Sequence, residues 1–95
     1  MRLDKMKVEW NNDENLLLQE QRGLCFEDVE REILKGNVLD LIPHFNQEKY
    51  PNQKILVIRL NDYVHYVPYV LDKETLFLKT IVPNRKLNKF YKLKD

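Results

Sequence analysis

The sequence contains no serine, one cysteine and only two glycines. The absence of serine excludes a hydrolase built on a serine nucleophile, and the chain has no glycine-rich phosphate loop. The single cysteine, Cys25, has no partner for an internal disulfide. Its apolar neighbours Leu24 and Phe26 instead indicate a small packed side chain.

Long apolar runs and clustered metal ligands are also missing. No segment approaches the roughly 18 uninterrupted apolar residues of a membrane span, and residues 1–5 lack the apolar run of a signal peptide. We therefore expect a cytoplasmic protein without a membrane partner. His44 and His65 lie 21 positions apart and no cysteines are paired, so we expect neither a metal ion nor a cofactor.

The composition is that of one folded domain. The chain has 95 residues, of which 43% are hydrophobic and 33% charged. This is enough to bury one core but too little for two. We expect a single α+β domain that spans residues 1–95.

Local patterns predict helices before strands. A short strand at residues 7–10 precedes a helix at residues 13–21 and a second helix that begins at Phe26 and ends at Gly36. After a polar loop at residues 44–53, strands are expected at residues 54–60, 63–71 and 75–81, followed by a short helix at residues 85–92. Pro68 predicts a bulge or an unpaired side in the middle strand. The expected architecture is an antiparallel sheet of three to four strands with both N-terminal helices on one face.

Two-residue hairpin turns would fix which strand residues share a face. They place Leu60 opposite Tyr63 and Leu71 opposite Glu74, which sets Tyr66 opposite Lys79. The helix-covered face then carries Leu56, Ile58, Leu60, His65, Val67, Leu76, Leu78 and Thr80. The other face mixes cations and aromatic rings on an apolar floor, and its members are Arg59, Val64, Tyr66, Phe77, Lys79 and Ile81.

Charge is divided between the two ends of the chain, although the formal net charge is only +1. Residues 9–32 carry eight acids and two bases, a balance of −6. Residues 76–94 carry six bases and no acid, a balance of +6. The basic C-terminal segment is therefore the place where we expect a binding or catalytic role.

The mixed face has two interpretations. RNA is bound by cations that neutralise phosphate and by aromatic rings on which unstacked bases lie, and Arg59, Tyr66, Lys79, Arg85 and Lys86 would supply both. Alternatively, Arg59 and Lys79 are ordinary strand residues whose stems cover apolar surface while their charges stay in water. The residues alone leave both interpretations open.

Metal-independent RNA cleavage needs a base for the attacking 2′-hydroxyl, an acid for the leaving oxygen, and cations for the developing charge. The groups available are Lys79, Arg85, Arg59, Tyr66, Tyr91 and His65. The unperturbed pKa of histidine suits a base, but the expected register puts His65 on the helix-covered face, which favours a hydrogen-bonded core residue. His44 lies in the long loop and is less constrained, so both histidines remain acid or base candidates.

Several short motifs follow the pattern of a known toxin family. Residues 8–11 (Val-Glu-Trp-Asn), then Arg22 and Gly23, then Phe26 and Glu27, are similar to the N-terminal pattern of the BrnT family of bacterial toxins. Residues 78–86, followed by Tyr91, resemble that family's final strand and basic turn. Three positions depart from the family, because Asn11, Glu14 and Arg22 stand where it usually has Asp, Lys and His.

The BrnT resemblance implies a RelE-like ribonuclease, the toxin of a type II toxin–antitoxin module. Such a toxin cuts RNA, inhibits translation, and is neutralised by a ribbon-helix-helix antitoxin, here expected in a hetero-oligomer. The resemblance implies that Lys79 and Arg85 are the basic active-site residues. We expect the substrate RNA to be bound by Arg59, Tyr66, Lys86 and Tyr91.

Two other functions remain open from the sequence. One is a non-catalytic module that binds RNA or a protein through the same basic face. The other is a structural subunit whose acidic N-terminal half docks a basic partner. Salt-dependent RNA binding and RNA cleavage separate the three.

Overall fold

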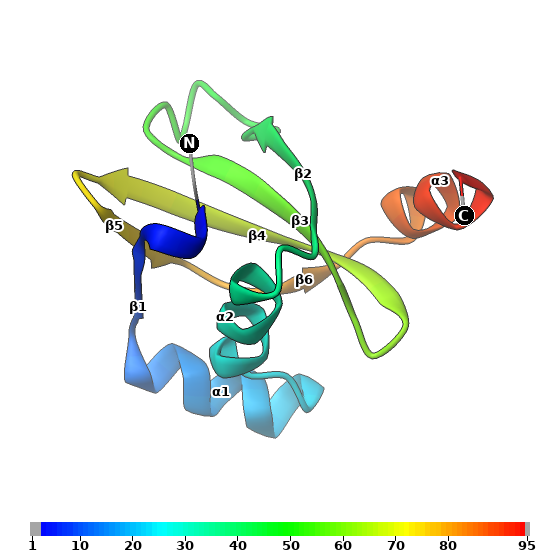
Figure 1. Cartoon of the computed structure of the whole chain (residues 1–95), viewed down its shortest axis with the longest axis horizontal. Coiled ribbons are helices and arrows are strands. Elements are labelled where there is room, and N and C mark those ends of the chain that lie inside the picture. Colours follow the sequence, from blue (N-terminus) through cyan, green and yellow to red (C-terminus); the bar gives the residue numbers. More distant parts are fainter. Residues whose placement is uncertain (1–2, 95) are drawn as a thin grey trace.

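A computed structural model describes residues 3–94 and shows an α+β domain with one sheet and helices on both sides of it (Figure 1). Residues 1, 2 and 95 of the expected domain lie outside the described residues. The elements in chain order are a 3-10 turn (Leu3–Lys5), β1 (Lys7–Trp10), α1 (Asn12–Arg22), α2 (Phe26–Leu34), β2 (Val38–Pro43), β3 (Lys54–Leu60), β4 (Tyr63–Asp72), β5 (Thr75–Leu78), β6 (Val82–Pro83) and α3 (Arg85–Lys94). No helix within residues 3–94 has the length and apolar character needed to cross a membrane.

The described sheet has six strands, and one of its pairings is parallel. The strand order is β1-β5-β4-β3-β2, with β6 paired to β4 beyond the end of β5. β1 runs parallel to β5, with Lys7 beside Thr75. The expectation of three to four antiparallel strands was therefore wrong in number and in direction. β1 and β5 are far apart in the sequence, and α1 and α2 lie between β1 and the later strands. A parallel pair needs such a long connection between its two strands.

Helix α1 extends one residue beyond the predicted residues 13–21 at each end. The side chain of Asn11 accepts a 3.0 Å hydrogen bond from the backbone of Glu14, which caps the helix. At the other end Gly23 adopts a positive φ of 64°, and its N–H donates to the carbonyl of Gln19. Glycine has no Cβ and therefore adopts this left-handed conformation with the least strain.

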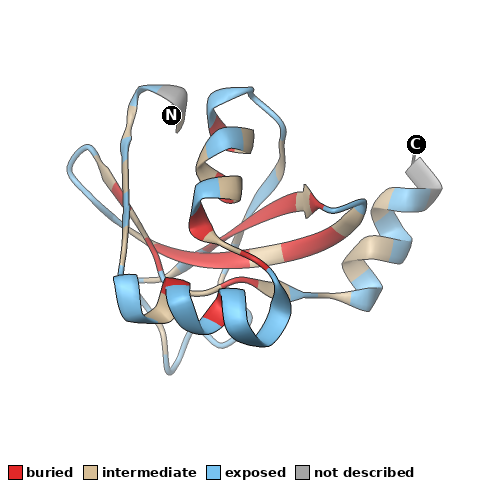
Figure 2. Ribbon diagram, turned by 90° about the horizontal axis from the view of Figure 1, so that it is seen from below, coloured by how far each residue is buried: buried red, intermediate tan, exposed pale blue. Residues whose placement is uncertain are grey.

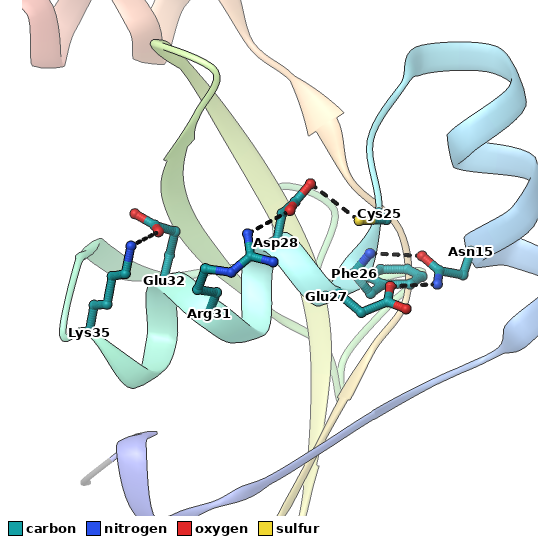
Figure 3. Close-up of polar contacts among 8 residues, drawn as sticks. All are labelled: Asn15, Cys25, Phe26, Glu27, Asp28, Arg31, Glu32 and Lys35. Atoms are coloured by element: carbon teal, nitrogen blue, oxygen red, sulfur yellow. Dashed lines mark hydrogen bonds and ion pairs between the residues drawn. The ribbon is translucent and has the colours of Figure 1, made fainter.

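The corner between α1 and α2 is held by Asn15, a buried polar residue. Its Oδ1 accepts a 2.7 Å hydrogen bond from the backbone of Phe26, and its Nδ2 donates to Oε1 of Glu27 at 2.8 Å (Figure 3). The residue at the N-cap position of α2, Cys25, makes no capping bond with its side chain. Asn15, which belongs to α1, therefore supplies a hydrogen-bond acceptor for a backbone N–H in the first turn of α2.

Both N-terminal helices pack on one face of the sheet, as expected. The core between them is buried, as the red segments of Figure 2 show, and its members are Leu18, Leu24, Phe26, Val29, Ile33, Leu56, Ile58, Leu60, Val67, Tyr69, Leu76, Leu78 and Ile81. Trp10 of β1 stacks on Phe26, with ring centroids 5.6 Å apart. Burial of so much apolar surface is the main force that joins the helices to the sheet.

The β3–β4 hairpin has the predicted register, with Leu60 beside Tyr63 and Val57 beside Tyr66. The β4–β5 hairpin turns one residue later than expected, because Lys73 adopts a positive φ of 55° and Asp72 pairs with Thr75, and this shifts the pairing by two residues. Leu71 consequently faces Leu76 and not Glu74. A shift of two residues keeps each side chain on its predicted face.

A bulge opposite Pro68 changes the register after β5. The backbone of Lys79 donates to the Pro68 carbonyl at 2.8 Å, and pairing resumes only where Val82 meets Tyr66. From Leu78 to Val82 the chain advances four residues, whereas β4 advances three from Tyr69 to Tyr66. The unpaired side predicted at Pro68 is confirmed, whereas the extra residue lies in the segment opposite and not in β4.

The shifted turn and the extra residue together correct two expectations about the mixed face. Tyr66 lies beside Val82, not beside Lys79. Ile81 turns to the helix-covered side, where it is fully buried in the core. A bulged residue reverses the alternation of side chains beyond it, which the simple hairpin register did not include.

Candidate functional site

The sheet face opposite α1 and α2 is partly covered, and we call it the α3 face. Its buried residues are Ile55, Val57 and Val64, and around them pack Leu39, Ile42, Tyr66, Leu87 and Tyr91. Leu87 and Tyr91 belong to α3, which therefore covers one end of a face that the sequence suggested was open. α3 lies well away from α1 and α2 (Figure 1).

Three hydrogen bonds, two of them through side chains, hold α3 on this face, and a fourth caps the helix. Asn84 caps the helix by accepting a hydrogen bond from the backbone of Leu87 at 2.8 Å. The backbone N–H of Asn84 donates to the Val64 carbonyl at 3.1 Å, and Oδ1 of Asn88 accepts from the Val64 N–H at 3.0 Å. The hydroxyl of Tyr91 donates to Oδ2 of Asp40 at 3.1 Å. Burial and the Asp40 carboxylate together raise the pKa of the Tyr91 phenol.

The exposed side of α3 is strongly basic. Four of its side chains are exposed cations, namely Arg85, Lys86, Lys89 and Lys92, and the helix sequence contains no acid. Arg85 and Lys86 occupy the first turn, where the helix macrodipole is already positive and disfavours cations. A helix N-terminus with two added cations is an arrangement that attracts phosphate.

Lys79 lies beside the bulge at the other end of the α3 face. Its side chain is exposed, and its ammonium is 4.7 Å from the ring centroid of Phe77, a cation–π contact. It lines a cavity of about 470 Å³ together with Asn11, Asp13, Glu14, Leu17 and Phe77. An ammonium and two carboxylates therefore border the same open space.

α1 fixes the bulge that carries Lys79. Oε2 of Glu14 accepts a 2.9 Å hydrogen bond from the Thr80 hydroxyl, and the Arg22 guanidinium donates to the Ile81 carbonyl at 3.0 Å. The positions that depart from the BrnT pattern thus have structural contacts in this chain. Glu14, which reverses a charge, binds the segment next to Lys79.

The two predicted catalytic cations are separated along the sheet. The backbone of Lys79 bonds to Pro68, whereas Asn84, next to Arg85, bonds to Val64. These two positions of β4 are four residues apart, about 13 Å at 3.3 Å per residue. Lys79 and Arg85 therefore lie at different points of the α3 face.

Tyr66 lies between them, in contact with a residue that the sequence analysis missed. The ring of Phe45 meets the half-buried Tyr66 ring edge to face, with centroids 5.0 Å apart and planes at 83°. Phe45 is 58% exposed. A phenylalanine within the polar loop of residues 44–53 was the available signal, because such a residue is expected to be buried or to contact a ligand.

The two histidines do not meet the basic groups. His65 is only 5% exposed on the helix-covered side, and its Nδ1 donates to the Tyr63 carbonyl at 2.8 Å. Burial lowers its pKa, and the nearby Arg22 charge lowers it further, against the opposing effect of the Tyr63 carbonyl. His44 accepts from the backbone of Asn46 at 2.9 Å and contacts Tyr50, with ring centroids 4.6 Å apart.

Arg59 lies apart from the other predicted site residues. It is half-buried and lines a cavity of about 610 Å³ between α2, the start of β2 and the β3–β4 turn. Asp28, Glu32 and Asp62 line the same cavity. The structure therefore gives Arg59 acidic neighbours, in contrast to the cations of α3.

Comparisons of the chain with models of known protein families, with curated proteins and with solved structures gave no match. The functional argument therefore depends on the geometry of the α3 face. Within residues 3–94, no group of three or more histidine, cysteine or acidic side chains is arranged to hold a metal ion.

Proposed function

We propose that this protein is a metal-independent endoribonuclease, the toxin of a type II toxin–antitoxin module, and that it binds RNA on α3 and the adjoining α3 face. The observation that carries the proposal is the set of exposed cations on α3, free of any acid in that helix and placed beside the aromatic residue Tyr66. Cations next to aromatic rings bind single-stranded RNA through its phosphates and its bases.

The proposed cleavage uses the groups that border the Lys79 cavity. The Glu14 carboxylate accepts the proton of a ribose 2′-hydroxyl as the 2′-oxygen forms a bond to phosphorus. Lys79 donates a proton to the 5′-oxygen as its bond to phosphorus breaks. The ammonium also stabilises the charge on the phosphate oxygens. The proposal is supported by the shared cavity of Lys79 and Glu14.

Arg85 and Lys86 are assigned to phosphate binding. They are about 13 Å from Lys79 along β4, by the strand rise of 3.3 Å per residue, so they hold a different phosphate of the same RNA. Their position at the N-terminus of α3 adds the partial positive charge of the helix to their own. Loss of this contact displaces the substrate and slows cleavage.

The proposed partner is a ribbon-helix-helix antitoxin, in a hetero-oligomer within the cytoplasm. An RNA-cutting toxin must be kept inactive in the cell that makes it. The cations of α3 are exposed and available to acidic groups of a partner. An antitoxin that covers them would prevent RNA binding.

Controlled expression in bacteria tests the proposal. Growth and RNA integrity are followed for the wild-type chain, for Arg85→Ala, and for Lys35→Ala as a matched loss of one cation. Lys35 makes a 3.6 Å ion pair with Glu32 on α2, far from α3 in Figure 1, and such an exposed pair contributes little to stability. We expect growth arrest and RNA loss with the wild type and Lys35→Ala, and neither with Arg85→Ala. Normal growth and intact RNA with folded wild-type protein would contradict the proposal.

A non-catalytic RNA-binding module is the second candidate, favoured by the position of the histidines. His65 is buried away from the basic face and His44 is engaged within its own loop, so neither is placed as a base beside Lys79. Purified protein separates the two functions, because an enzyme shortens RNA whereas a binding module only retards it in a gel. In either case Lys86→Ala should make RNA binding less dependent on salt concentration, by an amount that corresponds to roughly one phosphate contact.

A further inference from the structure

An exposed aromatic ring packs against Tyr66 of the α3 face. Phe45 is 58% exposed, and its contact with Tyr66 has the edge-to-face geometry of a favourable aromatic pair. Tyr66 in turn packs against the buried residues of the α3 face. The ring of Phe45 is thus supported from one side while more than half of its surface meets water.

The loop that carries Phe45 is held by its own hydrogen bonds. The backbone N–H groups of Lys49 and Tyr50 donate to the side chain and the carbonyl of Asn46, at 3.1 and 3.0 Å. The N–H of Asn46 donates to the His44 ring at 2.9 Å, and that ring contacts Tyr50. These bonds place Phe45 before any ligand arrives, which reduces the entropy lost on binding.

Cationic groups lie on both sides of Phe45 along β4. Val64, two positions before Tyr66, bonds to Asn88 of α3 and to Asn84 just before this helix. The backbone of Lys79 bonds to the carbonyl of Pro68, two positions after Tyr66. At 3.3 Å per residue, the α3 end and the Lys79 end each lie about 7 Å from Tyr66 along β4. A ring flanked by cations in this way matches the alternation of bases and phosphates in one nucleic-acid strand.

We propose that Phe45, supported by Tyr66, is a stacking site for an unpaired base of single-stranded RNA whose phosphates contact α3 and Lys79. The inference rests on the proposed function and specifies its substrate as single-stranded. A base within a duplex is already stacked on its neighbours, so the Phe45 ring discriminates against duplex RNA. Phosphate contacts alone would not make this distinction.

The test measures the affinity of purified full-length protein for a fluorescently labelled, 2′-O-methylated oligonucleotide, which cannot be cleaved through its 2′ position. The single strand is compared with the duplex of the same sequence. Phe45→Leu should weaken binding of the single strand about 10-fold, the effect of losing one stacked base. Duplex binding and the salt dependence of binding should stay as in the wild type, because the cations are unchanged.

Two variants control the measurement. Phe45→Trp keeps an aromatic ring and should bind the single strand as the wild type does. Leu34→Ala removes a side chain that is 62% exposed on α2 and should leave RNA affinity unchanged. Because Phe45 is 58% exposed, its replacement by Leu should lower the midpoint of urea unfolding only slightly, through loss of the aromatic contact with Tyr66.

The outcomes distinguish failure of this inference from failure of the proposed function. If the wild type binds and cuts RNA but Phe45→Leu binds the single strand equally well, the stacking site is wrong and the ribonuclease proposal stands. If the wild type binds no RNA at any salt concentration, both are wrong. If Phe45→Leu changes sedimentation of the free protein but not RNA affinity, Phe45 is a protein contact and the inference is overturned.

Discussion

The hydroxyl of Tyr91 donates a 3.1 Å hydrogen bond to Oδ2 of Asp40, which joins α3 to the edge strand β2 across 51 positions of the sequence. The ring of Tyr91 also packs against the buried residues of the α3 face. The bond is exposed to water, so its contribution is to position the helix more than to stabilise the whole domain. α3 carries the cations proposed to bind RNA, and this contact therefore helps to orient them.

Tyr91→Phe should loosen α3 without unfolding the domain. The variant keeps the packed ring and loses one exposed hydrogen bond, worth about 0.5–1 kcal/mol. Amide hydrogen exchange within residues 88–92 should become faster, while β3 and β4 keep their protection. Tyr50→Phe is the control, because Tyr50 lies in the loop and should leave exchange in α3 unchanged. Equal protection of α3 in Tyr91→Phe and the wild type would show that the bond does not hold the helix.

Asn15→Ala should destabilise the domain strongly, although it removes only one amide side chain. The change removes both hydrogen bonds of Asn15, and it leaves the buried N–H of Phe26 without its acceptor. We expect a loss of about 1–3 kcal/mol in the free energy of unfolding, measured in urea. Asn12→Ala changes an exposed amide of the same helix and should cost less than about 0.5 kcal/mol. Similar losses in both variants would contradict the role given to Asn15.

His65 should make the stability of the domain depend on pH near neutrality. Burial lowers its pKa below the ordinary value of 6.5, so the unfolded chain binds a proton that the folded one does not. Stability should therefore be greatest above pH 6.5 and should fall as the pH is lowered toward the folded pKa. His65→Asn removes the titrating ring and keeps a donor for the Tyr63 carbonyl.

Urea unfolding midpoints at several pH values between 5.5 and 7.5, a range chosen around the histidine pKa of about 6.5, check this prediction. The wild type and the control His44→Asn should lose stability toward the acidic end. His65→Asn should show a smaller dependence on pH, whatever its overall stability. An unchanged dependence in His65→Asn would assign the effect to another group.

Local sequence patterns predicted most elements of this fold, and long-range pairings were the part that they missed. The predicted strand at residues 54–60 and the predicted helix start at Phe26 agree with the structure. Both predictions depend on residues that are close in the sequence, namely the apolar pattern of the strand and the acids in the first turn of the helix. The segment that forms β2 was not predicted as a strand, because its pairing with β3 crosses the long loop. The parallel contact of β1 with β5 likewise depends on how the helices fold the chain back.

The candidate site was predicted less completely than the fold. The hairpin register placed His65 on the helix-covered side, where it is buried. The same register could not include the bulge at Pro68, which moves Ile81 into the core. Leu87 and Tyr91 are four residues apart in a basic helix, a spacing that predicts one apolar stripe, and this stripe is what covers part of the α3 face. The roles of Lys79 and Arg85 in RNA cleavage stay predictions.

The pairing of β1 with β5 has a consequence for the newly made chain. Lys7 reaches its partner Thr75 only after 68 further residues are synthesised, which takes roughly 3–14 s at about 5–20 residues per second. During that interval β1 has no strand to join, and contacts so distant in sequence also slow folding. Lys79 and Arg85 are synthesised later still. A translating ribosome therefore completes the sheet and the proposed RNA site only after β5, β6 and α3 have been made, so that shorter products carry neither.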